Sequence, residues 1–111
     1  MENSVLNEEF LATLPASLRE RLIQMFSEST PVQIEKIKQH LKENDPKLVI
    51  ETAHSLKGSG LAIGALQFSD ILGKIQQEAK RGLNSALMGN LLQEAEIVFA
   101  LTVEHLRQYQ K

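Results

Sequence analysis

The chain has 111 residues, a net charge of −2, 42% apolar residues and neither Cys nor Trp. This composition predicts one folded domain with an aliphatic core, and the lack of Cys excludes disulfides, thiolate catalysis and zinc–thiolate sites. The negative charge argues against a protein that binds nucleic acid by neutralising phosphates, so we expect no nucleic-acid partner.

The sequence also predicts where the protein works. No run of residues approaches the roughly 20 apolar positions that a membrane span requires. The N-terminal segment, MENSVLNEEF, is acidic and has no apolar signal core. We therefore expect a cytoplasmic protein that does not bind membranes, with residues 1–111 forming a single domain and no apolar surface that demands a dimer.

Helical periodicity dominates the first half of the chain. A short apolar segment, 5–14, comes first, and apolar positions then recur at helical spacing from about residue 17 to 43. Pro31 leaves two interpretations open in this region. Thr30 and Gln33 resemble a capping box that would start a new helix, whereas one long helix would have to tolerate a proline kink.

Three further helices are predicted, at about 46–63, 65–81 and 85–109. The NDP stretch at 44–46 supplies a cap and then a proline at the first helical position, Gly64 and Gly82 are natural stops, and Asn84 can cap the last helix. The short connections favour antiparallel neighbours. We predict an all-α, antiparallel up-down-up-down four-helix bundle, with a core at about 17–109 and a short extra N-terminal helix.

The helix at 46–63 carries an unusual outer side. At about 100° per residue, one side is the expected core face and the opposite side is expected to face solvent. The solvent side holds Ile50, His54, Lys57, Gly58 and Leu61. Because glycine leaves a low surface beside the imidazole, another molecule could approach it closely.

This pattern favours phosphoryl chemistry on His54. A neutral imidazole is a competent nucleophile near neutral pH, and Lys57, one turn away, can offset the charge of a phosphoryl group. The sequence has no nucleotide-binding glycine loop and no evident carboxylate cluster for Mg²⁺. We therefore expect no cofactor on this chain, no ATP-dependent kinase activity, and a partner that supplies the metal ion.

The following helix is expected to complete the site. Gln76 and Lys80 lie at the edge of its apolar stripe, and in an antiparallel pair this edge could face the imidazole. Gln76 could then hydrogen-bond one ring nitrogen, and Lys80 would add a second positive charge. His40 and His105 have no comparable surroundings and are interpreted as surface residues, and the Met and Phe positions are interpreted as core.

The stretch HSLKGSGLAIGA, residues 54–65, resembles the signature of histidine-containing phosphotransfer (HPt) domains. The resemblance covers about residues 17–109. It implies a four-helix bundle that carries phosphoryl groups between aspartates of receiver domains, with Mg²⁺ bound by the receiver. By resemblance, His54 is the phosphoacceptor, Lys57 stabilises the phosphoryl group and Gly58 admits the receiver. Gln76 matches a position that hydrogen-bonds near the imidazole, and Lys80 a position that is often basic.

The resemblance implies partners in the receiver domains of response regulators and hybrid histidine kinases, and it favours the unbroken helix through Pro31. Ile50 and Leu61 are expected to flank the docking surface. Two alternatives remain: a helical adaptor that regulates a receiver or kinase without being phosphorylated, and the phosphoacceptor domain of a larger histidine kinase. The initial Met favours a free-standing protein.

Overall fold

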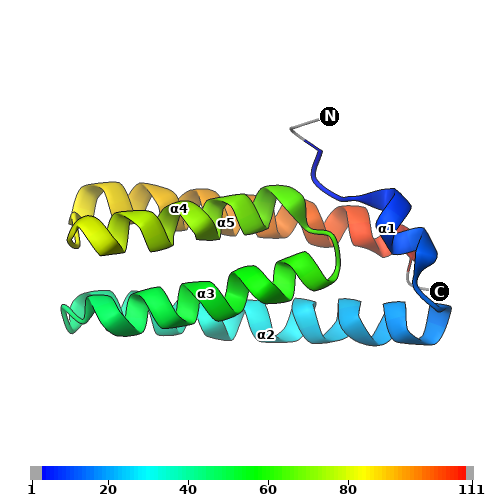
Figure 1. The fold of residues 1–111 in the computed structure, drawn as a ribbon, viewed down its shortest axis with the longest axis horizontal. Coiled ribbons are helices and arrows are strands. Elements are labelled where there is room, and N and C mark those ends of the chain that lie inside the picture. Colours follow the sequence, from blue (N-terminus) through cyan, green and yellow to red (C-terminus); the bar gives the residue numbers. More distant parts are fainter. Residues whose placement is uncertain (1–3, 110–111) are drawn as a thin grey trace.

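The computed structural model describes residues 4–109, and Figure 1 shows their arrangement. The elements in chain order are α1 (Glu8–Thr13), α2 (Ala16–Lys42), α3 (Pro46–Ala62), α4 (Leu66–Arg81), α5 (Ser85–Leu106) and a short 3-10 helix, η1 (Arg107–Tyr109). Helices α2 to α5 run up and down in sequence, and α5 returns to pack against α2. The predicted antiparallel four-helix bundle with a short extra N-terminal helix is confirmed.

The helix starts follow the capping signals of the sequence. The side chains of Asn7, Asp45 and Asn84 accept hydrogen bonds from backbone N–H groups three residues later, at 3.1, 3.2 and 3.0 Å. Each bond satisfies one of the donors that the first turn of a helix leaves free. Pro46 follows its cap at the first helical position, where its missing N–H costs nothing.

Pro31 lies inside α2, which continues unbroken over 27 residues. The interpretation of Thr30 as a helix cap is therefore wrong, and the single long helix is confirmed. Thr30 is fully buried on the core side of α2, together with Ile34 one turn later. Packing of this buried face against the rest of the bundle offsets the hydrogen bond that the proline removes.

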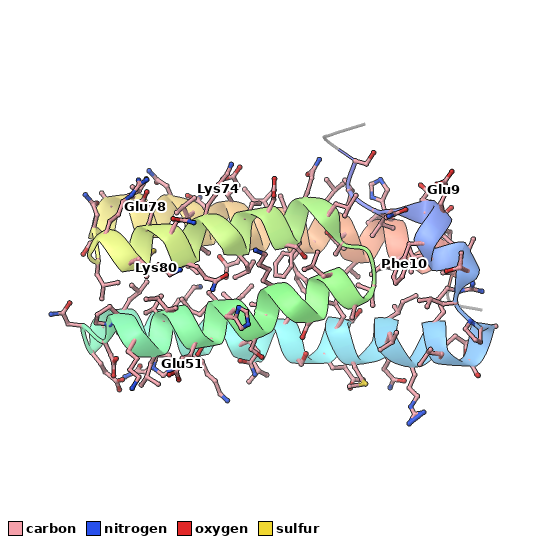
Figure 2. All side chains as sticks on the ribbon, in the orientation of Figure 1. Glu9, Phe10, Glu51, Lys74, Glu78 and Lys80 are labelled. Carbon is pink, nitrogen blue, oxygen red and sulfur yellow. The ribbon has the colours of Figure 1, made fainter. Side chains whose placement is uncertain are left out.

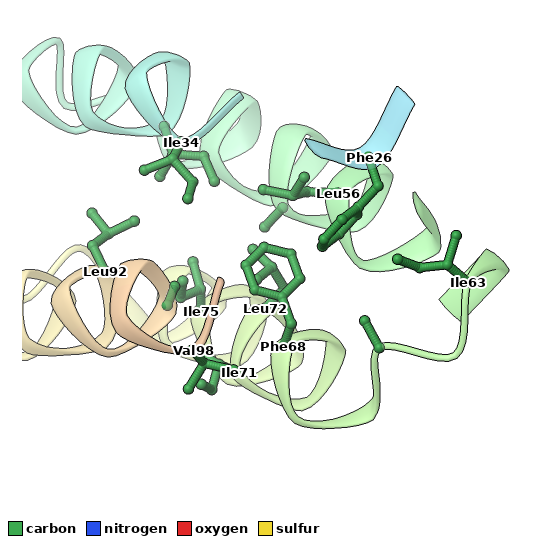
Figure 3. Close-up of a cluster of buried hydrophobic side chains, with 14 of the residues drawn as sticks. Phe26, Ile34, Leu56, Ile63, Phe68, Ile71, Leu72, Ile75, Leu92 and Val98 are labelled. Carbon is green, nitrogen blue, oxygen red and sulfur yellow. The ribbon is translucent and has the colours of Figure 1, made fainter. Parts of the chain in front are cut away.

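The core is aliphatic with one aromatic cluster. The Phe26 and Phe68 rings meet edge to face at 5.4 Å between centroids, and Phe99 lies 5.4 Å from Phe26. Figure 3 shows Phe26 and Phe68 among the aliphatic side chains of α3 and α4. The interpretation of the Met and Phe positions as core is wrong for Met25, which is 59% exposed, and for Phe10, which is 37% exposed, while Met1 lies outside the described residues.

The N-terminal segment closes one end of the bundle, beside the C-terminal end of the chain (Figure 1). The Asn7 N–H donates to the Gly64 carbonyl at 2.8 Å, in the turn between α3 and α4. Gly64 has a φ of 72°, which a residue with a side chain rarely adopts. The Arg19 guanidinium of α2 donates to the carbonyls of Leu11 and Leu14 at 3.2 and 3.3 Å, so α1 is also tied to α2.

Helix α5 corrects the expectation that no segment of the chain approaches the length and apolar composition of a membrane span. Within residues 4–109, the segment Ser85–Tyr109 has the length and composition of a membrane span, with a mean hydropathy of 1.3 over 18 residues. The sequence-based test for a long apolar run missed it because charged residues interrupt the segment. In this bundle α5 buries Met88, Leu92, Ala95 and Val98 in the shared core, and 28% of the 18-residue window is buried.

Candidate functional site

His54 lies in the middle of α3 and its side chain is exposed, while the adjacent Ala53 and nearby Leu56 are buried. The helical period therefore separates the imidazole from the core as predicted. Its Nδ1 atom lies 3.5 Å from Nε2 of Gln76, which α4 contributes from 22 residues later. The two residues that the sequence assigned to one site are thus in contact across the α3–α4 pair.

The side chains of Lys57 and His54 both extend from α3 toward α4. Its ammonium lies over Gly73 of α4, 3.5 Å from the point where a Cβ at that position would stand. Gln76, the neighbour of the imidazole, follows Gly73 by one turn. The ammonium and the imidazole therefore share the side of α3 that faces α4. Among residues 4–109, no carboxylate lies within 4.0 Å of the Lys57 ammonium, so it carries its charge unpaired.

Gly58 leaves open space beside the imidazole. A Cβ built at Gly58 would meet no heavy atom within 4 Å, apart from its own helix and chain neighbours. Gly60, two residues later, differs, because a Cβ there would collide with the Ser69 hydroxyl of α4. The two glycines therefore have different consequences: Gly58 lowers the outer surface, and Gly60 allows α4 to pack closely on α3.

The remaining predicted site residues occupy different environments. Lys80 is exposed, one turn after Gln76, and Figure 2 shows it on the α4 edge that faces α3, whereas Lys74 and Glu78 lie along the other edge. Leu61 is 50% exposed, as expected for a surface residue. Ile50 differs from the prediction, since it is half-buried and packs against the core.

An apolar groove on the other side of α3 was missed by sequence reasoning. It encloses about 190 Å³ between α2 and α3, with Met25 of α2 and Ala62 of α3 on its walls. Met25 belongs to a series of exposed apolar residues that recur every seven residues along α2: Leu18, Met25 and Val32. That seven-residue spacing was the available signal, but core residues of a long helix produce the same spacing.

The described residues hold no group of three His, Asp or Glu side chains suited to a metal ion. His40 and His105 are both half-buried: His40 lies 3.6 Å from the Glu43 carboxylate, and His105 contacts the Leu101 carbonyl one turn earlier in α5 at 2.9 Å. The bundle therefore presents one exposed imidazole with an unpaired ammonium on the same side. An exposed imidazole can act as a nucleophile when its ring is neutral.

The chain belongs to the Hpt domain family, whose model matches residues 21–109. The fold is similar to the crystal structure of histidine-containing phosphotransfer protein B (HptB) from Pseudomonas aeruginosa PAO1, with a TM-score of 0.86 and 22% identity over 96% of this chain and 94% of that chain. Comparison with curated proteins finds no match. Hpt domains act in histidine phosphotransfer within phosphorelays as carriers and not as kinases, and they interact with receiver domains.

Proposed function

We propose that this protein is a phosphorelay intermediate that accepts a phosphoryl group on His54 from the phospho-aspartate of a receiver domain and passes it to another receiver aspartate. The observation that carries the proposal is the exposed imidazole on α3, held by Gln76 on one ring nitrogen. With Nδ1 engaged by α4, the other ring nitrogen, Nε2, is the one available to an incoming phosphorus atom.

The chemistry requires a specific tautomer of His54. In the reactive form Nδ1 carries the proton and donates a hydrogen bond to Oε1 of Gln76. That orientation of the Gln76 amide is related to the present one by a 180° turn. The Nε2 lone pair then attacks phosphorus, the bond from phosphorus to the aspartyl oxygen breaks, and the carboxylate leaves. In the second transfer a carboxylate oxygen attacks phosphorus, and the P–N bond returns its electron pair to Nε2.

Lys57 and Lys80 supply positive charge in this proposal. A phosphoryl group brings about two negative charges near neutral pH, and an ammonium without a carboxylate partner is free to bind its oxygens. Neither lysine forms an ion pair among residues 4–109. The receiver contributes Mg²⁺ and the acceptor aspartate, so this chain needs no cofactor of its own.

The receiver is proposed to dock over α3. Gly58 gives it access to the imidazole, because no side chain stands there, and Leu61 offers apolar surface one turn further on. Ile50 supports the other flank with the part of its side chain that is not buried. One surface must serve both donor and acceptor receivers in turn, so each complex is expected to be transient.

The cellular setting follows from the same proposal. We propose a monomeric, cytoplasmic protein whose residues 1–111 act as one domain, with response regulators and hybrid histidine kinases as partners. The net charge of −2 supports protein partners over nucleic acid. The exposed nucleophile supports a carrier over an adaptor, because an adaptor does not need a reactive imidazole.

Replacement of His54 tests the function directly. Wild-type protein mixed with a phosphorylated receiver should gain label that is labile in acid and stable in base, and His54→Gln should gain none while keeping its helical circular dichroism. Because the side chain is exposed, we expect the substitution to change the free energy of unfolding by less than about 0.5 kcal/mol. Label on folded His54→Gln would show that the assignment is wrong. Binding of the receiver by wild-type protein without label would favour the adaptor.

A further inference from the structure

The stem of Lys57 lies along α4 at Gly73. A Cβ built at Gly73 would stand 3.5 Å from the Lys57 Nζ atom, 3.8 Å from Cε and 4.0 Å from Cδ, and these three are its nearest neighbours outside its own helix backbone. The Cδ, Cε and Nζ atoms of Lys57 therefore pass over α4 at Gly73, a position that has no side chain. A Cβ alone would make ordinary contact, but any longer side chain would occupy the space of the lysine stem.

The backbone of Lys57 is tied to the same helix. The Ser69 hydroxyl of α4 donates to the Lys57 carbonyl at 3.3 Å. Gly60 lies directly against Ser69, because a Cβ on Gly60 would collide with that hydroxyl. The distance between the two helices is therefore fixed at the residue from which the lysine side chain starts. Ser69 and Gly73 are one turn apart, so α4 contacts both ends of Lys57.

The same edge of α4 continues to the imidazole. Gln76 follows Gly73 by three residues and contacts His54. The edge thus contacts the Lys57 backbone through Ser69, its side chain at Gly73, and the His54 ring through Gln76. A lysine side chain loses rotamer freedom when it is fixed in one arrangement. The stem lies in a trough, the hollow that Lys57, Gly73, Lys74 and Gln77 line together with other residues of α4. Because the trough already restricts the stem, less freedom remains to be lost when a phosphoryl group binds.

A glycine inside a helix normally weakens it, which makes its presence here informative. Glycine in a helix interior is less favourable than alanine. Gly73 lies in the middle of α4, away from the turns at either end. We propose that Gly73 is a positioning residue: it keeps open the trough that holds Lys57, and thereby holds the ammonium on the His54 side for the transferring phosphoryl group. This inference rests on the proposed function.

The test compares two glycines that occupy helix interiors. Gly73→Leu should fill the trough and displace Lys57, whereas Gly73→Ala should leave the lysine in place. Gly89→Leu is the matched control, because Gly89 lies in α5, is exposed and has no atom within 4 Å of its Cβ position. The donor is phosphoramidate, a small molecule that requires no docking surface, and phosphohistidine formation is followed by 31P NMR.

We expect Gly73→Leu to slow labelling of His54 by about fivefold, the loss expected from removing one partly exposed charge. Gly73→Ala and Gly89→Leu should keep the wild-type rate. Because helix propensity improves, Gly73→Leu should unfold at the same denaturant concentration as wild type or a higher one. If Gly73→Leu does not fold, Gly73→Gln gives the same test, since its flexible polar chain suits a half-exposed position.

The coupling to Lys57 separates positioning from a structural role. In a Lys57→Ala background, Gly73→Leu should cause no further loss of rate, because the displaced group is already absent. A wild-type rate for Gly73→Leu, or a loss that persists in the Lys57→Ala background, would overturn this inference and leave the proposed function standing. If wild-type protein takes label only from a phosphorylated receiver, that receiver serves as the donor in the same comparison of variants. If wild-type protein takes no label on His54 from either donor, both the proposed function and the inference are wrong.

Discussion

Lys57 carries the strongest prediction at the scale of single residues. Its ammonium has no carboxylate partner among residues 4–109 and lies on the side of α3 that faces Gln76. Lys57→Ala should therefore slow phosphoryl transfer to His54 by about fivefold, equivalent to about 1 kcal/mol, because the site is open to water and screening limits the charge effect. Single-turnover transfer from a phosphorylated receiver measures the rate.

Lys74 provides the control for that change. It is an exposed lysine on the same helix as Gln76, and it lines the same hollow as Lys57 from the edge of α4 that lies away from α3 (Figure 2). Lys74→Ala removes the same charge from the molecule and should leave the transfer rate within about twofold of wild type. Equal losses in the two variants would mean that overall charge, and not the position of Lys57, determines the rate.

At the scale of helices, the α3–α4 pair depends on Gly60. A Cβ at this position would collide with the Ser69 hydroxyl and would stand 3.3 Å from the Phe68 ring. Gly60→Ala should therefore lower the free energy of unfolding by about 1 kcal/mol, because an overpacking penalty of about 2 kcal/mol exceeds a gain in helix propensity of about 1 kcal/mol. Urea unfolding followed by circular dichroism measures the change.

Ser69 identifies the cause of that loss. Ser69→Ala removes the colliding hydroxyl, so Gly60→Ala should be less harmful in the Ser69→Ala background than in wild type. Gly89→Ala should stabilise the protein, since its Cβ position is empty and only helix propensity changes. A Gly60→Ala protein as stable as Gly89→Ala would show that α3 and α4 can separate slightly at no cost.

The helices were largely predictable from local chemistry. Asp45 and Asn84 cap their helices through hydrogen bonds within three residues, and Gly64 ends a turn with a φ of 72°. Such signals act between residues that are close in the sequence, so they can be identified from the sequence alone. The outward direction of His54 followed from the helical period, because a buried face on one side leaves the other side for solvent.

The details that sequence could not supply depend on contacts between helices. Pro31 is compatible with a cap or with an interior position, and only burial of the neighbouring Thr30 decides between them. Met25 fits the apolar repeat of α2, yet it is 59% exposed, because periodicity identifies a stripe without its width. The position of Lys57 over Gly73 requires the register of α3 against α4, which no local pattern contains.

At the scale of the whole molecule, the N-terminal and C-terminal elements meet at Tyr109. Its hydroxyl donates to the Glu8 carboxylate at 3.3 Å, and the Arg19 guanidinium lies 5.6 Å from the centre of its ring. Burial, together with the negative charge of Glu8, raises the pKa of Tyr109 above its ordinary value, although Arg19 opposes the shift. The neutral phenol is therefore the form that the folded protein favours.

This raised pKa predicts a loss of stability in alkali. The Tyr109 contribution is fully present below the unfolded pKa of about 10 and is lost as pH rises through the higher folded pKa. Wild-type protein should therefore lose more stability between pH 8 and about pH 11 than Tyr109→Phe, which cannot titrate. Urea midpoints at the two pH values measure the difference. Equal losses of stability in the two proteins would mean that ionisation of the Tyr109 phenol does not affect the stability of the folded protein.

The proposed receiver surface occupies one side of the bundle, so two exposed apolar residues should respond differently to substitution. Leu61 is 50% exposed on the His54 helix, and Ile97 is 63% exposed on α5, which does not pack against α3 among the main helix contacts. Leu61→Ser should raise the Kd for a receiver domain by about tenfold, or about 1.4 kcal/mol, because it removes apolar contact on one flank of the proposed interface.

Ile97→Ser makes the same change in polarity away from this surface, so its Kd should match that of wild type. Titration calorimetry with a receiver domain gives both values. Labelling of His54 by phosphoramidate should proceed at the wild-type rate in both variants, because a small donor needs no docking surface. A higher Kd for Ile97→Ser with an unchanged Kd for Leu61→Ser would place the receiver on α5, too far from the imidazole for direct transfer. That result would contradict the proposed docking over α3.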